Sequence, residues 1–199
     1  MKKLLLSAFV LLSVVLILHL PFQTDPICFL AAAAIHELGH VFALGLCGYG
    51  IKGLSLSPAG LTLQTDSDLI PYQREILIFL AGPLFNALGM MWCLYRIRLA
   101  PTEMLFYFLF CHGFFMAVNL LPICGLDGYG ALTATVSLLR KECDAEARLR
   151  PVHVFFSILL IAFGTLLTLC TQNASLLFLS LSLFLEKRKK LRKNRSFFS

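Results

Sequence analysis

The feature that most constrains this chain is a charged motif inside an apolar run. Nearly every residue from 26 to 48 is apolar, and the run is long enough to cross a bilayer as a helix, which takes about 20 residues. Near its middle lies the sequence HELGH, at residues 36–40. An ionisable side chain at that depth costs at least about 2.5–3.5 kcal/mol, so such side chains are usually functional and face the protein interior. The run therefore predicts a transmembrane helix that carries a functional site.

The spacing of the motif predicts the kind of site. His36 and His40 are four residues apart, so both imidazoles lie on one face of the helix and can bind the same metal ion. Glu37 stands beside them, placed to take a proton from a water molecule that the metal activates. The alternative is a chance match, because short patterns of this kind occur in soluble helices. A bilayer offers no water to solvate a stray glutamate, and this favours the metal site.

Composition places the chain among membrane proteins. Of its 199 residues, 58% are hydrophobic, and the mean hydropathy is +0.82. This is more apolar surface than a soluble protein of this size can bury, so we expect an all-α polytopic membrane protein with a single domain over residues 1–199. Seven of the 17 basic residues and one acidic residue fall in the tail 186–199, which leaves ten of each sign in the remainder. A tail beside anionic membrane lipid explains the net charge of +6, and nucleic acid is not an expected partner.

Hydropathy predicts about six transmembrane helices. Besides the HELGH helix they are an N-terminal helix at 4–20, spans at 73–95 and 102–121, and C-terminal helices within 152–185, the last at 174–185. We interpret the segment at 4–20 as an uncleaved helix, since no small-x-small cleavage site follows it. Six spans place both termini and the basic tail in the cytoplasm, and they place the metal site toward that side.

A hairpin is predicted between the second and third spans. Two short alternating runs, Leu54/Leu56 and Leu61/Leu63, flank a turn at Pro58-Ala59-Gly60. A hairpin beside a membrane metal site has an exposed edge that can pair with an extended peptide. An ordinary interfacial loop is an equally good interpretation of these residues.

Polar residues at two broken segments complete the site. Gly82 and Pro83 interrupt the third span, and Asn86 just after them is a buried amide that needs a partner. Beyond the fourth span, the Pro- and Gly-rich segment 119–128 breaks the helix and carries Asp127. We predict that residues 129–150 form a helix that emerges into water, followed by a loop. Two other histidines receive ordinary structural interpretations: a hydrogen-bonded packing residue for His112 and an interfacial residue for His153.

A catalytic zinc ion takes three protein ligands and keeps one position for water or substrate. The third ligand must therefore come from outside the HELGH motif. Asp127 is the best candidate, and Cys124 is a rival because a thiolate also binds zinc. Asn119 can hold the substrate backbone or the oxyanion. These residues predict metal-assisted peptide hydrolysis inside the membrane.

Three motifs carry a resemblance to a known family. HELGH at 36–40, AGPLFN at 81–86 and NLLPICGLDG at 119–128 resemble, in this order, the motifs of the site-2 protease family of intramembrane zinc metalloproteases. They lie within residues 26–140, which would form the three-helix core of that family. The resemblance implies one Zn²⁺ held by His36, His40 and Asp127, with Glu37 as catalytic base. It also implies that Asn119 and Asn86 contact the substrate and that a membrane-associated β-hairpin lies beside the site.

The layout resembles the sporulation branch of that family. This implies a multi-pass protein of the bacterial cell membrane that cuts a membrane-associated protein near the cytoplasmic face, such as a sporulation pro-sigma factor or an anti-sigma factor. Regulatory membrane proteins and lipids would be its other partners. The chain shows a basic tail where that branch often has a nucleotide-sensing domain. The alternatives are a zinc transporter, for which a polar path across the other spans is missing, and a non-catalytic peptide-binding relative, which would not need Glu37.

Overall fold

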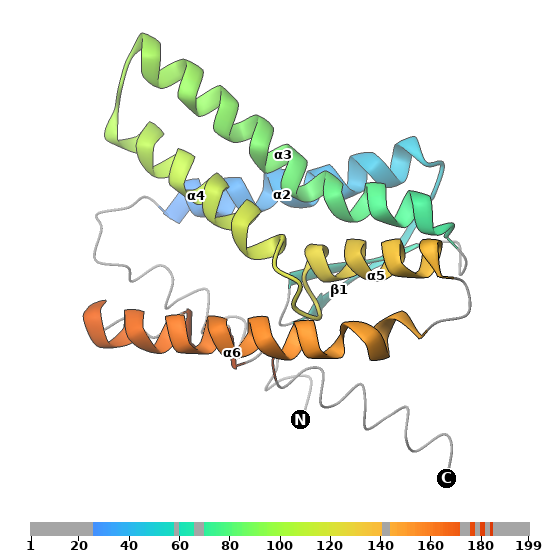
Figure 1. Cartoon of the computed structure of the whole chain (residues 1–199). Helices are drawn as coiled ribbons and strands as arrows, with labels where there is room; N and C mark the ends of the chain where they lie inside the picture. Colours follow the sequence, from blue (N-terminus) through green and yellow to red (C-terminus); the bar gives the residue numbers. More distant parts are fainter. Residues whose placement is uncertain are drawn as a thin grey trace.

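The computed structural model describes residues 26–57, 60–65, 70–140 and 144–171, with a few residues from 176 to 184. This part of the chain forms five α-helices and a two-stranded sheet (Figure 1). In chain order these are α2 (Pro26–Leu46), β1 (Ile51–Ser57), β2 (Gly60–Thr65), α3 (Tyr72–Leu99), α4 (Glu103–Asn119), α5 (Asp127–Leu139) and α6 (Ala145–Thr171). The predicted helix at 4–20, the tail at 186–199 and most of the predicted last span at 174–185 lie outside the described residues.

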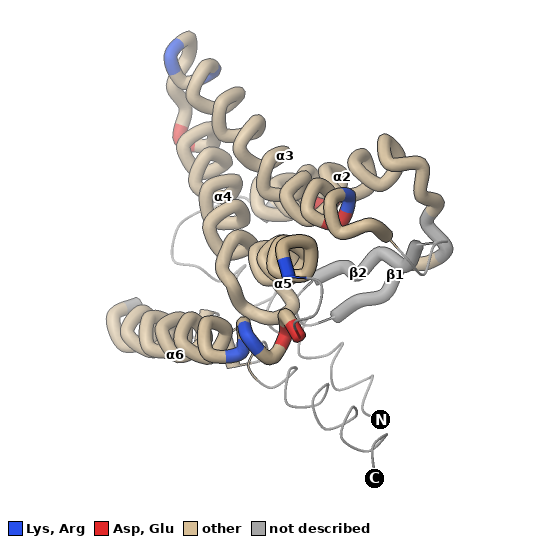
Figure 2. Tube along the Cα trace, turned by 45° about the vertical axis from the view of Figure 1, so that its right-hand side comes forward, with Lys and Arg blue, Asp and Glu red and all other residues tan. Residues whose placement is uncertain are grey.

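The protein is an all-α membrane protein with three candidate spans among its described helices, namely α2, α3 and α6. α4 is apolar but has only 17 residues, so it is shorter than the fourth span predicted at 102–121. The charged residues of these helices lie near helix ends, as Figure 2 shows for the Lys, Arg, Asp and Glu positions. Glu37, midway along α2, is the exception. The described helices therefore show three of the six predicted spans.

The faces of the helices are reversed relative to a soluble protein. Large apolar side chains are exposed along α2, α3 and α6, among them Phe42, Trp92 and Leu159. Side chains with polar atoms are buried between the helices; they include His36, His40, Asn86, His112 and His153. Lipid solvates an apolar exterior, whereas buried polar groups need partners within the protein.

α2 ends in a left-handed glycine, and the paired strands follow. Gly48 adopts φ +79°, the N–H of Gly48 donates to the carbonyl of Gly45 (3.0 Å), and the N–H of Tyr49 donates to that of Leu44 (3.0 Å). The strands β1 and β2 then pair antiparallel, with Leu54 opposite Leu63 and Leu56 opposite Leu61. This is the pairing predicted over 54–63, and the connecting residues 58–59 lie outside the described residues.

α3 is the element on which the others pack. It lies against α2, α4 and α5. The contact with α2 is close because Gly39 has no side chain: a Cβ there would lie 2.5 Å from the carbonyl oxygen of Ala81. α5 buries Tyr129, Ala131 and Ala134. The predicted helix after residue 129 is therefore present and packs on α3, and its emergence into water stays a prediction.

The region after residue 140 also differs from prediction. We expected a loop up to 150, but α6 begins at Ala145, and the Asp144 carboxylate accepts the N–H of Ala147 (3.2 Å) as a helix cap. Buried residues recur about every four positions along α6, and they form a stripe on one face: Ala145, Leu149, His153, Ser157 and Leu160. His153 belongs to this stripe and is 2% exposed, so it packs within the protein; its predicted depth at the membrane interface stays a prediction.

Candidate metal centre

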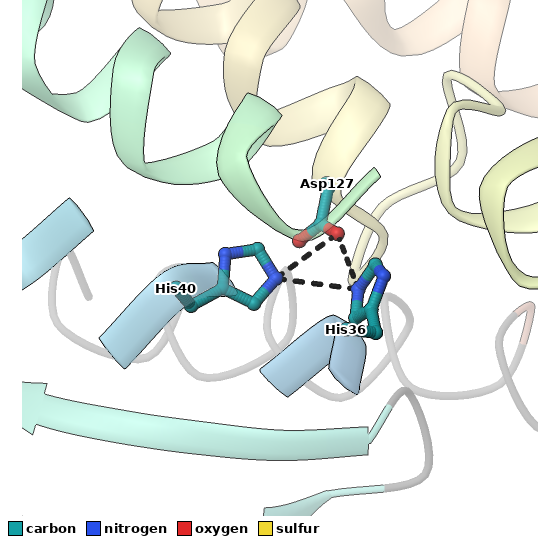
Figure 3. Close-up of side chains that lie close together, drawn as sticks. All are labelled: His36, His40 and Asp127. Carbon is teal, nitrogen blue, oxygen red and sulfur yellow. Dashed lines mark hydrogen bonds and ion pairs between the residues drawn. The ribbon is translucent and has the colours of Figure 1, made fainter. Parts of the chain in front are cut away.

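The structure brings together three of the residues that the sequence singled out. The side chains of His36 and His40 from α2 and of Asp127 from the start of α5 point toward one another (Figure 3). One ligand atom of each lies within 4.8 Å of the other two, and both histidines are buried. Among the described residues this is the group that can hold a metal ion. Cys124, the rival ligand, does not belong to it.

The separations fit a small tetrahedral cation. The Nε2 atoms of the two histidines are 3.3 Å apart, and Asp127 Oδ2 is 2.9 Å from His36 Nε2 and 3.3 Å from His40 Nε2. Ligands that bind zinc tetrahedrally at about 2.0–2.1 Å lie about 3.3 Å from one another. Two imidazoles and one carboxylate are also a donor set that zinc accepts, with one position left over.

The hydrogen bond behind His40 supports the same conclusion. His40 Nδ1 lies 2.8 Å from the carbonyl oxygen of Ile78, which can only accept, so Nδ1 carries the proton of the neutral ring. Nε2 then presents a lone pair to Asp127 Oδ2, a buried oxygen without a hydrogen-bond partner among the described residues. Two acceptors that face each other at 3.3 Å repel, and a cation between them relieves the repulsion.

Space for the imidazoles comes from a glycine on α3. A Cβ at Gly82 would lie 2.7 Å from Cε1 of His40 and 2.8 Å from Cε1 of His36, closer than such atoms approach. The sequence predicted only that Gly82 and Pro83 interrupt this helix. The packing role depends on how α2 and α3 face each other, which no local pattern reveals.

His36 is held from behind by two residues in succession. Asn86 Nδ2 lies 2.9 Å from His36 Nδ1, and Asn86 Oδ1 lies 2.9 Å from His112 Nδ1. Both Asn86 and His112 have no exposed surface. His112 is a hydrogen-bonded packing residue as predicted, but its partner on α3 was not identified from the sequence. Both ends of the Asn86 amide face histidines, and its predicted contact with the substrate stays a prediction.

The segment between α4 and α5 positions Asp127. Near its end lies Gly125 with φ +100°, which besides Gly48 is the other glycine with positive φ among the described residues. The N–H of Cys124 donates to His153 Nδ1 (3.0 Å), which ties the segment to α6. The ring of Tyr129 lies against His153, and burial raises the pKa of Tyr129 to about 12, so this phenol stays protonated.

Two other residues were predicted for the site, Glu37 and Asn119. Glu37 directly follows His36 on α2 and is half-buried. Asn119 ends α4 and donates its side-chain N–H to the carbonyl of Phe115 (3.0 Å), so the structure does not bring it into the three-residue group. The roles of Glu37 as base and of Asn119 as substrate contact stay predictions.

Comparison with known proteins bears on both fold and family. No protein-family model matches the chain. The chain is 32% identical over 109 residues to stage IV sporulation protein FB of Bacillus subtilis, an alignment that covers 51% of this chain and 36% of that protein. The chain thus matches about a third of that relative's length. The fold matches the site-2 protease from Methanocaldococcus jannaschii with a TM-score of 0.61 at 22% identity, over 89% of this chain and 85% of the other.

These matches agree with the order of the three motifs and with the His-His-Asp group that the fold assembles. The sequence match shows similarity over half of the chain, and the structural match shows that the fold is shared over most of it. Together they agree with the resemblance seen in the sequence: the chain is similar to a site-2 protease in fold and to a sporulation protein in part of its sequence.

Proposed function

We propose that this protein is an intramembrane zinc metalloendopeptidase that cleaves a membrane-associated protein. The observation that carries the proposal is the group of two buried histidines, His36 and His40, and the half-buried Asp127, spaced for one tetrahedral ion in a membrane protein. Bound there, zinc would acidify a water molecule and polarise the scissile carbonyl.

Glu37 is the general base in this proposal. It sits one residue from His36, on the same helix as both histidine ligands. Its carboxylate accepts a proton from the attacking water and returns that proton to the leaving amine. The apolar surroundings exclude bulk water, which strengthens the interaction of each charged group with the developing charge.

The substrate class follows from where the group lies. A peptide must unfold locally to reach a site between helices, and the edge of the β1–β2 pair offers backbone groups to an extended segment. Asn119, at the end of α4, would bind the substrate backbone. Similarity to a protein named for a stage of sporulation supports a sporulation substrate such as a pro-sigma factor, with an anti-sigma factor as the other candidate. The predicted orientation puts the cut near the cytoplasmic face.

The proposal is tested with purified full-length protein, comparing wild type with Glu37→Gln and Asp127→Ala. Zinc content is measured alongside cleavage of a panel of single-span and pro-sequence-bearing substrates. We expect Glu37→Gln to keep one zinc ion and lose about 10²–10⁴-fold in cleavage rate, since it removes only the base. Asp127→Ala should lose both zinc and cleavage. Equal cleavage by wild type and Glu37→Gln would refute the proposal.

A further inference from the structure

A row of buried hydrogen-bonding side chains leads away from the metal centre. It starts at His36 on α2, passes through Asn86 on α3 and ends at His112 on α4, with both contacts at 2.9 Å. His112 lies outside the three motifs described above. Because each member comes from a different helix, the row links the position of a metal ligand to the packing of three helices.

Metal binding by His36 would determine which end of the Asn86 amide donates and which accepts. A histidine that binds a cation through Nε2 must carry its proton on Nδ1 when neutral, and that N–H donates to an oxygen. The oxygen available to His36 is Oδ1 of Asn86, so the NH₂ group of Asn86 must then face the other histidine. Half a turn about the last bond of the side chain exchanges the two ends of the amide. His112 Nδ1 can accept a hydrogen bond from the NH₂ group of Asn86 or donate one to its Oδ1. It therefore holds the amide in place while Oδ1 of Asn86 accepts the N–H of His36.

The ring of His112 is itself tightly held. Phe108 lies against it, with ring centroids 4.4 Å apart. On α3, a Cβ at Gly89 would lie 2.5–2.7 Å from three atoms of the ring. Nε2 of His112 is buried and has no partner among the described residues, so the polar contact that orients this ring is the one to Asn86.

We propose that His112 is a positioning residue for the metal ligand His36 and acts on it through Asn86. The inference rests on the proposed zinc site. Residues that orient a metal ligand from behind fix its tautomer and ring direction, and their loss typically costs about 10–100-fold in metal affinity. His112 touches neither the metal position nor the substrate, so it should affect zinc affinity before it affects any chemical step.

The test measures zinc affinity of the full-length protein in detergent by competition with a chelator. His112→Phe keeps a ring of similar size but no nitrogen, and we expect it to bind zinc about 10–100-fold more weakly than wild type. His112→Asn places an amide where Nδ1 was and should restore zinc affinity to within about threefold of wild type. His112→Gln has one more methylene group, which moves its amide away from the position of Nδ1, so this variant should not restore affinity. Cys111→Ala, a change at a buried neighbour on α4, is the control and should bind zinc as wild type does.

Each outcome is decisive. Wild-type affinity in His112→Phe, no advantage of Asn over Gln, or an equal loss in Cys111→Ala would overturn the inference, because each would make His112 only a packing residue. If His112→Phe does not accumulate, the Asn and Gln variants still decide between the two roles. Asp127→Ala is measured in parallel: if wild type binds zinc no better than Asp127→Ala, the proposed zinc site fails instead.

Discussion

Two buried histidines hold different parts of this protein. His112, in the cluster of α2, α3 and α4, reaches the proposed metal ligand His36 through the polar side chain of Asn86. His153, on α6, accepts the backbone N–H of Cys124, and it lies beside an apolar cluster formed by Ile123, Leu126 and Leu160. The first histidine orients a side chain, whereas the second holds a segment of backbone. Changes in the first region should therefore appear in metal affinity, and changes in the second should appear in stability.

The largest change in stability should come from a substitution in the apolar cluster of Ile123, Leu126 and Leu160. Ile123 has no exposed surface and packs with residues of α4 and α6. Ile123→Ala should lower the free energy of unfolding by about 2–5 kcal/mol, because it leaves a cavity. Reversible unfolding in mixed micelles measures this, and zinc affinity of the folded fraction should stay close to that of wild type. A large loss of zinc affinity with little loss of stability would break the comparison.

A smaller effect, on zinc affinity instead of stability, is expected from a substitution at Gly82. The methyl of Gly82→Ala would collide with the rings of His36 and His40, so the ligands themselves must move. Overpacking of this kind costs about 1–3 kcal/mol, which corresponds to about 5- to 150-fold weaker zinc binding if the whole cost falls on the metal site. Chelator competition should show weaker zinc binding with a small change in stability. Unchanged zinc binding would mean that the helices separate instead of displacing the rings.

Replacing His153 should cost less. His153→Phe removes the acceptor for the N–H of Cys124, but Cys124 is only half-buried, so water can replace part of the lost hydrogen bond. We expect about 1 kcal/mol lower stability and less than about a tenfold change in zinc affinity. The combination of His153→Phe with His112→Phe should be additive, because the two residues share no partner in the contacts described above. Strong non-additivity would show that α6 and the row of side chains behind His36 act as one unit.

The smallest effect is expected at Gly45, the matched control for Gly82. Gly45 lies on α2 and is exposed, and a methyl group added there would meet no atom within 4 Å. Gly45→Ala should change stability by no more than about 0.5 kcal/mol and should leave zinc binding unaltered. The same assays as for Gly82→Ala apply. A loss as large as that of Gly82→Ala would mean that small residues along α2 matter for a reason other than contact with α3.

The sequence predicted the metal centre better than its surroundings. Four-residue spacing fixes two side chains on one helix face, so His36 and His40 followed from local geometry alone. Asp127 came from its place in a broken, glycine-flanked segment, and the structure favours it over Cys124. Both inferences needed only local order along the chain.

The partners of Asn86, His112 and His153 were beyond that reasoning. They depend on which face each helix turns toward its neighbours. A helix in lipid is apolar on all sides, so its sequence does not show which face is buried. The start of α6 was misjudged because charged residues suggested a loop, although Asp144 caps a helix there. The buried stripe through Leu149 and His153 has helical spacing, and that signal was present in the sequence.

The room that Gly82 leaves for the imidazoles has an evolutionary consequence. His40 is a proposed metal ligand, and its ring also fills the space between α2 and α3 that Gly82 leaves open. Replacing it by a small residue would remove the metal and open a void, and a larger residue at position 82 could then fill that void. Two substitutions in contact would convert a hydrolytic site into a well-packed, inert scaffold with the same helices. Inactive descendants of such a protein should therefore be recognisable by a bulkier residue at this position.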